Sequence, residues 1–72
     1  MNREEFLTEL VELMMLDSEP ELTTELSSIA EWDSMTRLAL LSLFEDNLNI
    51  QIDVEDLADL NTIQELVDLA GL

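Results

Sequence analysis

Apolar residues recur at intervals of three and four near both ends of this chain, and that spacing makes helix the main element it can form. Near the start the apolar positions are Phe6, Leu7, Leu10, Val11 and Met14, and near the end they are Ile63, Leu66, Val67 and Ala70. Residues three and four positions apart share one face of an α-helix. Only 1 Gly and 1 Pro, the residues least favourable to helix, occur in the 72 residues. We therefore expect an all-α fold.

Capping residues mark where these two helices begin. Asn2, followed three positions later by Glu5, matches a capping box, in which two side chains bond free backbone N–H groups. Thr62 followed by Glu65 repeats the pattern. Gly71 is placed to end the last helix, since Gly readily adopts the left-handed conformation that often follows a helix.

A long connection is expected after the first helix. That helix should end near Leu16 or Asp17, because Pro20 cannot continue it. The stretch from Ser18 to Asp33 then forms a loop, and loops of such length are usually functional or packed down by their own side chains. The apolar residues available for this packing are Leu22, Leu26, Ile29 and Trp32. The helical spacing of the first three also allows a single helical turn.

The second helix is expected to run from Asp33 or Ser34 to about Asn47. Its apolar residues cover most of its sides and are Met35, Leu38, Ala39, Leu40, Leu41, Leu43 and Phe44. Such a helix is either central in a bundle or partly exposed for a partner. Residues 49–54 alternate as in a strand but have no partner strand, so we expect an extended connection that plugs the core, followed by a helix over 54–60. The expected fold is a small irregular four-helix bundle with a long loop between the first two helices and a short third helix.

The charge of the chain is strongly one-sided, with 18 acidic residues against 2 basic ones and a formal net charge of −16. Nucleic acids and anionic membrane surfaces repel such a chain, whereas partners with basic patches attract it. No apolar run approaches the roughly 20 residues that a membrane span needs. The first residues include acids where a signal peptide carries basic residues. We expect one monomeric, cytoplasmic domain over residues 1–72, without a nucleic-acid partner or a membrane span.

Two kinds of site are disfavoured by the residue types present. Nucleophilic catalysis by Ser34 needs a general base, but the chain has no histidine and the adjacent Asp33 is too weak a base. A calcium-binding loop beginning at Asp46 fails on spacing, since Gln51 stands where Gly is required and Leu57 where a bidentate Glu belongs. We therefore expect neither enzymatic activity nor a dedicated metal site.

Ser34 lies where the second helix begins. Serine is a favoured N-cap, so Ser34 is predicted to cap this helix, with Asp33 as the alternative. The helix dipole also favours a phosphate group at a helix N-terminus. The position therefore suits a phosphate-bearing modification introduced by another enzyme.

The motif Asp33-Ser34-Met35, taken with the acidic composition, the long first loop and the order of the helices, resembles the acyl carrier protein family. The resemblance covers essentially the whole chain, including Glu45 and Asp46 near the end of the second helix. It implies that Ser34, flanked by Asp33 and Met35, receives 4′-phosphopantetheine from coenzyme A. A phosphopantetheinyl transferase attaches this arm and supplies the base, and Mg²⁺ acts only through that enzyme. The arm's thiol then carries an acyl thioester between acyl-activating or acyl-transferring enzymes with basic patches, in a lipid or secondary-metabolite pathway.

Two positions depart from the usual pattern of that family. Trp32 stands where many members have a small residue, and Arg37 lies where fatty-acid carriers show acids. Both favour a discrete, specialised carrier over the housekeeping fatty-acid carrier. Trp32 either anchors the loop on the bundle or contacts the arm or a partner. Arg37 either pairs with Asp33, four residues earlier, or changes which enzymes dock.

The resemblance also implies two functional surfaces. The residues of the expected partner-binding surface are Glu31, Trp32, Thr36, Arg37, Glu45 and Asp46. The residues expected to line a groove for the cargo are Leu38, Leu41, Ile50, Leu57 and Ile63, each of which also suits the core. Two other functions stay open, an aminoacyl or peptidyl carrier with the same arm and an unmodified acidic helical adaptor.

Overall fold

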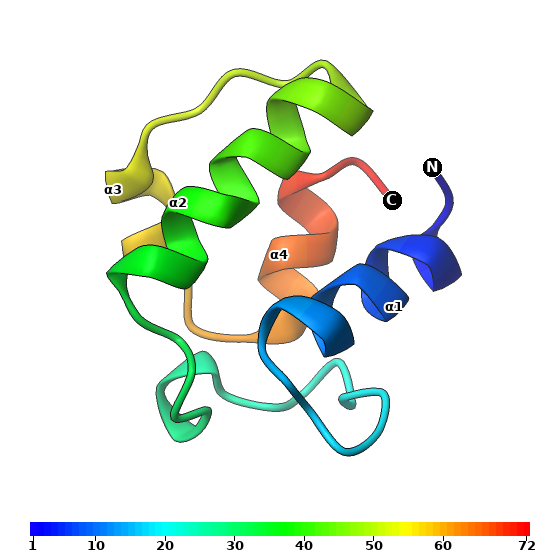
Figure 1. The fold of residues 1–72 in the computed structure, drawn as a ribbon, viewed down its shortest axis with the longest axis vertical. Helices are drawn as coiled ribbons and strands as arrows, with labels where there is room; N and C mark the ends of the chain where they lie inside the picture. Colours follow the sequence, from blue (N-terminus) through cyan, green and yellow to red (C-terminus); the bar gives the residue numbers. More distant parts are fainter.

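The structure is a computed structural model that describes residues 1–72, and its regular elements are all helical (Figure 1). The elements are α1 (Arg3–Leu13), the 3-10 turn η1 (Leu26–Ser28), α2 (Ser34–Leu43), the π-helical segment η2 (Phe44–Leu48), α3 (Val54–Ala58) and α4 (Ile63–Leu69). Figure 1 shows α4 between α1 and α2, with α3 beside α2. The expected all-α bundle, with its long first connection and short third helix, is confirmed.

The predicted caps are present at the starts of α1 and α4. The backbone N–H of Glu5 donates to the Asn2 side chain at 2.8 Å, and the N–H of Asn2 donates to the Glu5 carboxylate at 3.0 Å. At α4 the N–H of Glu65 donates to the Thr62 hydroxyl at 3.3 Å. The Glu65 carboxylate accepts instead from the N–H of Asn61, one residue before the cap, at 3.2 Å. The first capping box is therefore complete, and the second is shifted by one residue on its carboxylate side.

The end of α1 differs from the prediction. The helix stops at Leu13, before the expected Leu16 or Asp17. The cause is Met15, whose φ of 51° is left-handed. The N–H of Leu16 then turns back to the carbonyl of Val11 at 2.9 Å, which closes the helix as in a Schellman motif. No Gly marks this position, so the stop was not predicted.

The same backbone conformation ends two other helical segments. Asn49, after η2, has a φ of 56°, and Gly71, after α4, has a φ of 75°. The N–H of Leu72 donates to the carbonyl of Val67 at 3.1 Å across the last of these turns. The predicted role of Gly71 is confirmed.

The middle helices keep the expected order with small differences at their ends. α2 and η2 form one helical run to Leu48, against the predicted Asn47. α3 begins at a capping box in which the N–H of Asp53 donates to the Asp56 carboxylate at 3.0 Å. It stops two residues before the expected Leu60, so the third helix is shorter than predicted.

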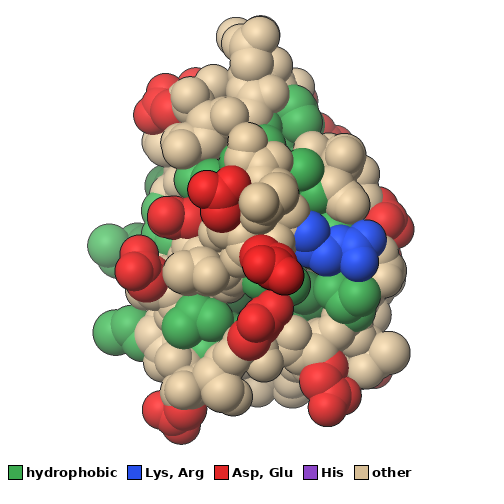
Figure 2. All heavy atoms as spheres, turned by 90° about the vertical axis from the view of Figure 1, so that its right-hand side faces the viewer, with side chains coloured by type: hydrophobic (Ala, Val, Ile, Leu, Met, Phe, Trp, Pro, Cys, Tyr) green, Lys and Arg blue, Asp and Glu red, His purple; other side chains and the backbone are tan.

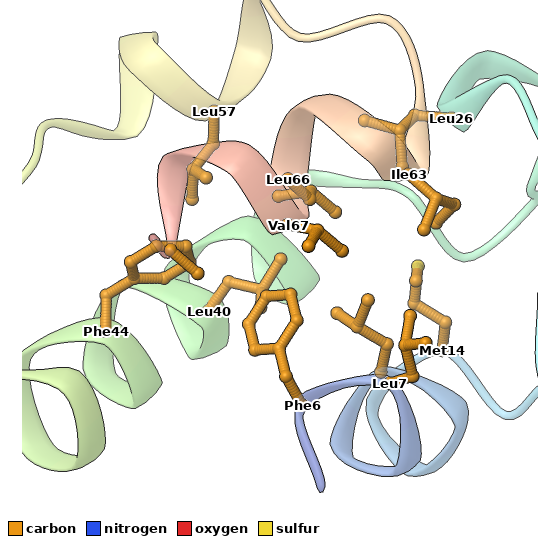
Figure 3. Close-up of a cluster of buried hydrophobic side chains, with 12 residues drawn as sticks. Phe6, Leu7, Met14, Leu26, Leu40, Phe44, Leu57, Ile63, Leu66 and Val67 are labelled. Carbon is orange, nitrogen blue, oxygen red and sulfur yellow. The ribbon is translucent and has the colours of Figure 1, made fainter. Parts of the chain in front are cut away.

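Twelve buried side chains form the core, part of which Figure 3 shows: Phe6, Leu7, Leu10, Met14, Leu26, Leu40, Phe44, Leu57, Ile63, Leu66, Val67 and Ala70. The rings of Phe6 and Phe44 meet edge to face, with centroids 5.9 Å apart and an interplanar angle of 83°. This favourable aromatic geometry joins α1 to η2. Ile50 and Ile52 pack against the core from the extended connection, as predicted.

The long first connection is fixed onto the segment between α3 and α4. Within it, η1 supplies the helical turn that the apolar spacing allowed, and Leu26 is fully buried. The N–H of Leu26 donates to the carbonyl of Asn61 at 2.8 Å, and the N–H of Ile63 donates to the carbonyl of Thr24 at 3.1 Å. Glu25 also forms an isolated antiparallel bridge with Thr62. The loop is thus tied down by backbone bonds as well as by its own side chains.

Acidic side chains are spread over the surface. Figure 2 shows the face that carries α1 and both chain ends, where acids are interspersed with apolar patches and basic surface is confined to a small area. None of the helices has the length and apolar character required to cross a membrane.

Candidate functional site

The start of α2 is organised by Asp33. Its backbone is extended, with φ −126° and ψ −177°, and its Oδ1 accepts a hydrogen bond from the N–H of Thr36 at 2.9 Å. Asp33 is therefore the N-cap, and Ser34 is the first helical residue. The prediction that Ser34 caps the helix is wrong, because the extended residue and the accepting side chain lie one position earlier. The exposed Ser34 hydroxyl takes no part in the cap.

Asp33 is held in its ionised form. The backbone N–H of Thr36 lowers the pKa of Asp33 from its ordinary value, and the Thr36 hydroxyl and the charge of Arg37 act in the same direction, while some loss of hydration opposes them. A carboxylate with a lowered pKa is a weaker base than an ordinary Asp. Asp33 is therefore unsuited to activate the neighbouring Ser34, as the sequence indicated.

Trp32 and Arg37 form a pair beside this serine. The Arg37 guanidinium carbon lies 5.6 Å from the centroid of the Trp32 ring, within cation–π range. Arg37 Nη1 also donates to the Trp32 carbonyl at 3.4 Å. The expected pairing of Arg37 with Asp33 is present only as an electrostatic effect, in which the charge of Arg37 helps to lower the pKa of Asp33. Trp32 itself is half-buried and packs against the core, which favours its role as an anchor of the loop.

A depression of about 410 Å³ lies next to this pair. Its lining residues are Glu25, Ser27, Trp32, Arg37, Ala58, Leu60 and Asn61. We call it the Trp32 pocket. Its walls come from the first loop, from the start of α2, and from the end of α3 with the segment that follows it. The sequence alone did not reveal it, because it depends on the loop being tied to Asn61.

The exposed side of α2 carries two large apolar side chains close to Ser34. Met35 is 81% exposed and Leu38 is 55% exposed, whereas Leu40 is fully buried. Met35 and Leu38 are three residues apart and so lie on neighbouring parts of one helical face. The resemblance implies a place in the cargo groove for Leu38 and only a flanking role in the motif for Met35. The apolar excess of the second helix was the signal that part of this surface faces outward.

The other residues expected at a partner surface lie in different environments. Glu45 and Asp46 are exposed in η2, at the opposite end of the helical run from Ser34, and Glu31 is half-buried. Thr36 is buried, with 9% of its surface exposed. Most of the Thr36 side chain is therefore inaccessible to a partner, and its visible role is to hold Asp33.

The five residues expected to line a cargo groove do not surround an open cavity. Leu57 and Ile63 are fully buried in the core, and Leu41 and Ile50 are half-buried against it. Leu38 is mostly exposed. The structure thus places two of these residues in the core and spreads the others from the core edge to the surface.

The chemistry at the start of α2 fits a phosphate group. An exposed hydroxyl occupies the first helical position, at Ser34, where the N–H groups of a first helical turn favour an anion. Arg37 adds a cation one turn further on. A family model described as "Phosphopantetheine attachment site" matches residues 4–70.

The chain belongs to the phosphopantetheine-binding carrier family.

Carriers of this family hold 4′-phosphopantetheine covalently, and they work with a modifying transferase and with enzymes that handle acyl groups. Searches of curated proteins and of solved structures returned no match. The match nearly spans this carrier, so the helices, the long loop and the start of α2 all belong to the family's domain.

Proposed function

We propose that Ser34 is the attachment point of the 4′-phosphopantetheine arm, and that this carrier presents acyl thioesters to successive enzymes. The supporting observation is that two adjacent residues have different roles at the start of α2. Asp33 takes the cap, so the Ser34 hydroxyl is exposed and unused within the Asp-Ser-Met motif. A phosphodiester formed there lies at the helix N-terminus, where negative charge is stabilised.

Within this proposal the chain supplies a hydroxyl group and leaves the proton transfer to the transferase. Asp33 is a weak base, and the chain contains no histidine. The attached arm supplies the terminal thiol that bears the cargo, so the absence of cysteine is no obstacle. The carrier itself is proposed to be non-catalytic, with its effect arising from the high local concentration of a tethered cargo.

Partner enzymes are proposed to dock on the exposed side of α2. Met35 and Leu38 offer an apolar contact beside Ser34, while Glu45 and Asp46 offer negative charge at the far end. A complementary partner has an apolar pocket near its active site and basic residues further away. A few well-packed contacts usually contribute most of the affinity at a protein interface, and the charges mainly speed the encounter.

We propose a single carrier domain over residues 1–72 that acts in the cytoplasm, in a specialised lipid or secondary-metabolite pathway, as Trp32 and Arg37 favour. Cargo uptake between α2 and α3 is proposed to require those helices to separate, since Leu57 of α3 is fully buried in the core. An aminoacyl cargo on the same arm remains the alternative within this class.

Intact-mass spectrometry tests the attachment. The purified protein is incubated with coenzyme A, Mg²⁺ and a broad-specificity phosphopantetheinyl transferase, and we expect a gain of one phosphopantetheinyl group. Ser34→Ala should abolish the gain, whereas Ser42→Ala, at another exposed serine of α2, should leave it intact. A wild-type protein that gains no mass would favour the unmodified adaptor. A gain that persists in Ser34→Ala would move the arm to another residue.

A further inference from the structure

Backbone contacts hold the two walls of the Trp32 pocket together. Leu26 and Asn61 join its two walls through the 2.8 Å hydrogen bond between their backbone groups, and Glu25 and Thr62 add the antiparallel bridge. Its volume of about 410 Å³ falls within the range of small-molecule sites, which are usually preformed. The pocket can therefore hold a small flexible group without prior rearrangement of the fold.

Arg37 is the only cation near the start of α2. The other basic residue of the chain, Arg3, donates to the carbonyl of Leu72 at 3.4 Å, where the two chain ends meet. Arg37 follows Ser34 by three residues, so the two side chains are neighbours on the helix surface. A guanidinium has five N–H donors, and the single long hydrogen bond to the Trp32 carbonyl leaves most of them available.

We propose that Trp32 and Arg37 form a docking place for the phosphopantetheine arm on the carrier itself. Arg37 binds the phosphodiester on Ser34, and the pantetheine part of the arm lies in the Trp32 pocket against the indole ring. This inference rests on the proposed attachment at Ser34. It identifies the two residues that depart from the family's usual pattern as the ones that hold the resting arm.

The lining of the pocket suits the chemistry of the arm. Pantetheine contains two amides and a hydroxyl, which need both hydrogen-bond donors and acceptors. Asn61 offers both, Ser27 offers a hydroxyl and Glu25 offers a carboxylate that accepts from amide N–H groups. The ring of Trp32 and the side chain of Leu60 cover the methylene and methyl groups.

The contact between Arg37 and Trp32 is one that a phosphodiester can displace. A charge-assisted bond between a guanidinium and a phosphate is stronger than a cation–π contact at a partly exposed site. Arg37 should therefore turn toward the phosphodiester when Ser34 is modified and uncover part of the indole ring. The arm then replaces the guanidinium as the group that covers Trp32.

The single tryptophan of the chain makes this testable by fluorescence. The protein is prepared without the arm and with the arm, and the mass of each form is checked first. Acrylamide quenching of Trp32 is then measured in both forms. We expect the quenching constant to fall by roughly a half on loading, because an arm seated in the pocket lies against the half-buried indole ring and shields it from the quencher.

Two arginine variants separate the proposal from a general effect of modification. Arg37→Ala, loaded to completion as checked by intact mass, should lose the difference in quenching between its two forms, while Arg3→Ala should retain it. The phosphorus resonance of the loaded protein should likewise shift in Arg37→Ala and not in Arg3→Ala.

The outcomes are distinct. A loaded protein whose Trp32 is quenched as strongly as before, or whose quenching difference survives Arg37→Ala, overturns the docking inference and leaves the attachment at Ser34 intact. A protein that gains no mass overturns the attachment itself, and the docking inference with it. A halved quenching constant that depends on Arg37 supports both.

Discussion

The backbone N–H of Thr36 donates a hydrogen bond to Asp33 Oδ1 at 2.9 Å, and this bond makes Asp33 the cap of α2. Ser34 is consequently the first helical residue, with its side chain exposed. The two adjacent residues thus divide two tasks, since one starts the helix and the other is free to be modified. A serine that did both would have its capping oxygen converted to an ester on modification. With the cap on Asp33, the helix would keep its cap before and after the proposed modification of Ser34.

Removing the cap should destabilise the fold, and removing the serine should not. Asp33→Ala is expected to lower Tm by about 5 °C, because an N-cap is among the few surface features with a large effect in a domain this small. Ser34→Ala should change Tm by less than about 1 °C, as for an exposed residue without partners. Thermal unfolding followed by circular dichroism measures both. Equal losses in the two variants would contradict the assignment of the cap.

The contribution of Asp33 to stability should be lost at acidic pH. Its pKa is lower in the folded state, so its contribution is complete above the pKa of the unfolded chain, about 3.9, and is lost as the pH falls through the lower folded pKa. The difference in Tm between wild type and Asp33→Asn should be constant above about pH 5 and shrink below about pH 4. Both proteins share the repulsion among the other acids, so its effect on Tm cancels when the two are compared. A difference that does not shrink in acid would show that Asp33 is unperturbed.

Replacing Met15 with glycine should stabilise the protein. Met15 has a φ of 51°, which is costly for a residue with a side chain, and it is 76% exposed, so little packing is lost. We expect a gain of about 0.5–1 kcal/mol, since relief of the left-handed conformation exceeds the added flexibility of the unfolded chain. Denaturant unfolding measures it. Met15→Ala, which keeps the Cβ, is the control and should give no gain.

The apolar surface of α2 should affect partner recognition but not folding. Met35→Ala and Leu38→Ala are each expected to lower kcat/KM of the loading transferase by about fivefold, as for a moderate anchor in an interface. Their Tm should change little, because both side chains are mainly exposed. Met15→Ala, at an equally exposed methionine outside α2, is the matched control. Unchanged loading of both α2 variants would remove this surface from the proposed docking site.

Much of the candidate site was predictable, because it depends on residues that are close in sequence. The motif Asp33-Ser34-Met35 marked the start of α2, and the two departures at Trp32 and Arg37 were visible as residue types. What could not be predicted was how they contact one another. Arg37 lies on the Trp32 ring and not against Asp33. The position of that ring depends on the first loop, which a backbone hydrogen bond ties to Asn61.

The sequence by itself determined the helical class, the starts of the helices and the role of Gly71. These features depend on hydrogen bonds and conformational preferences that span three or four residues, so local chemistry is sufficient. Only the tertiary structure decided that Leu38 faces solvent while Leu40 is buried, and that Leu26 bonds to Asn61. Burial depends on which distant segment covers a side chain, and that is a property of the assembled core rather than of any local pattern.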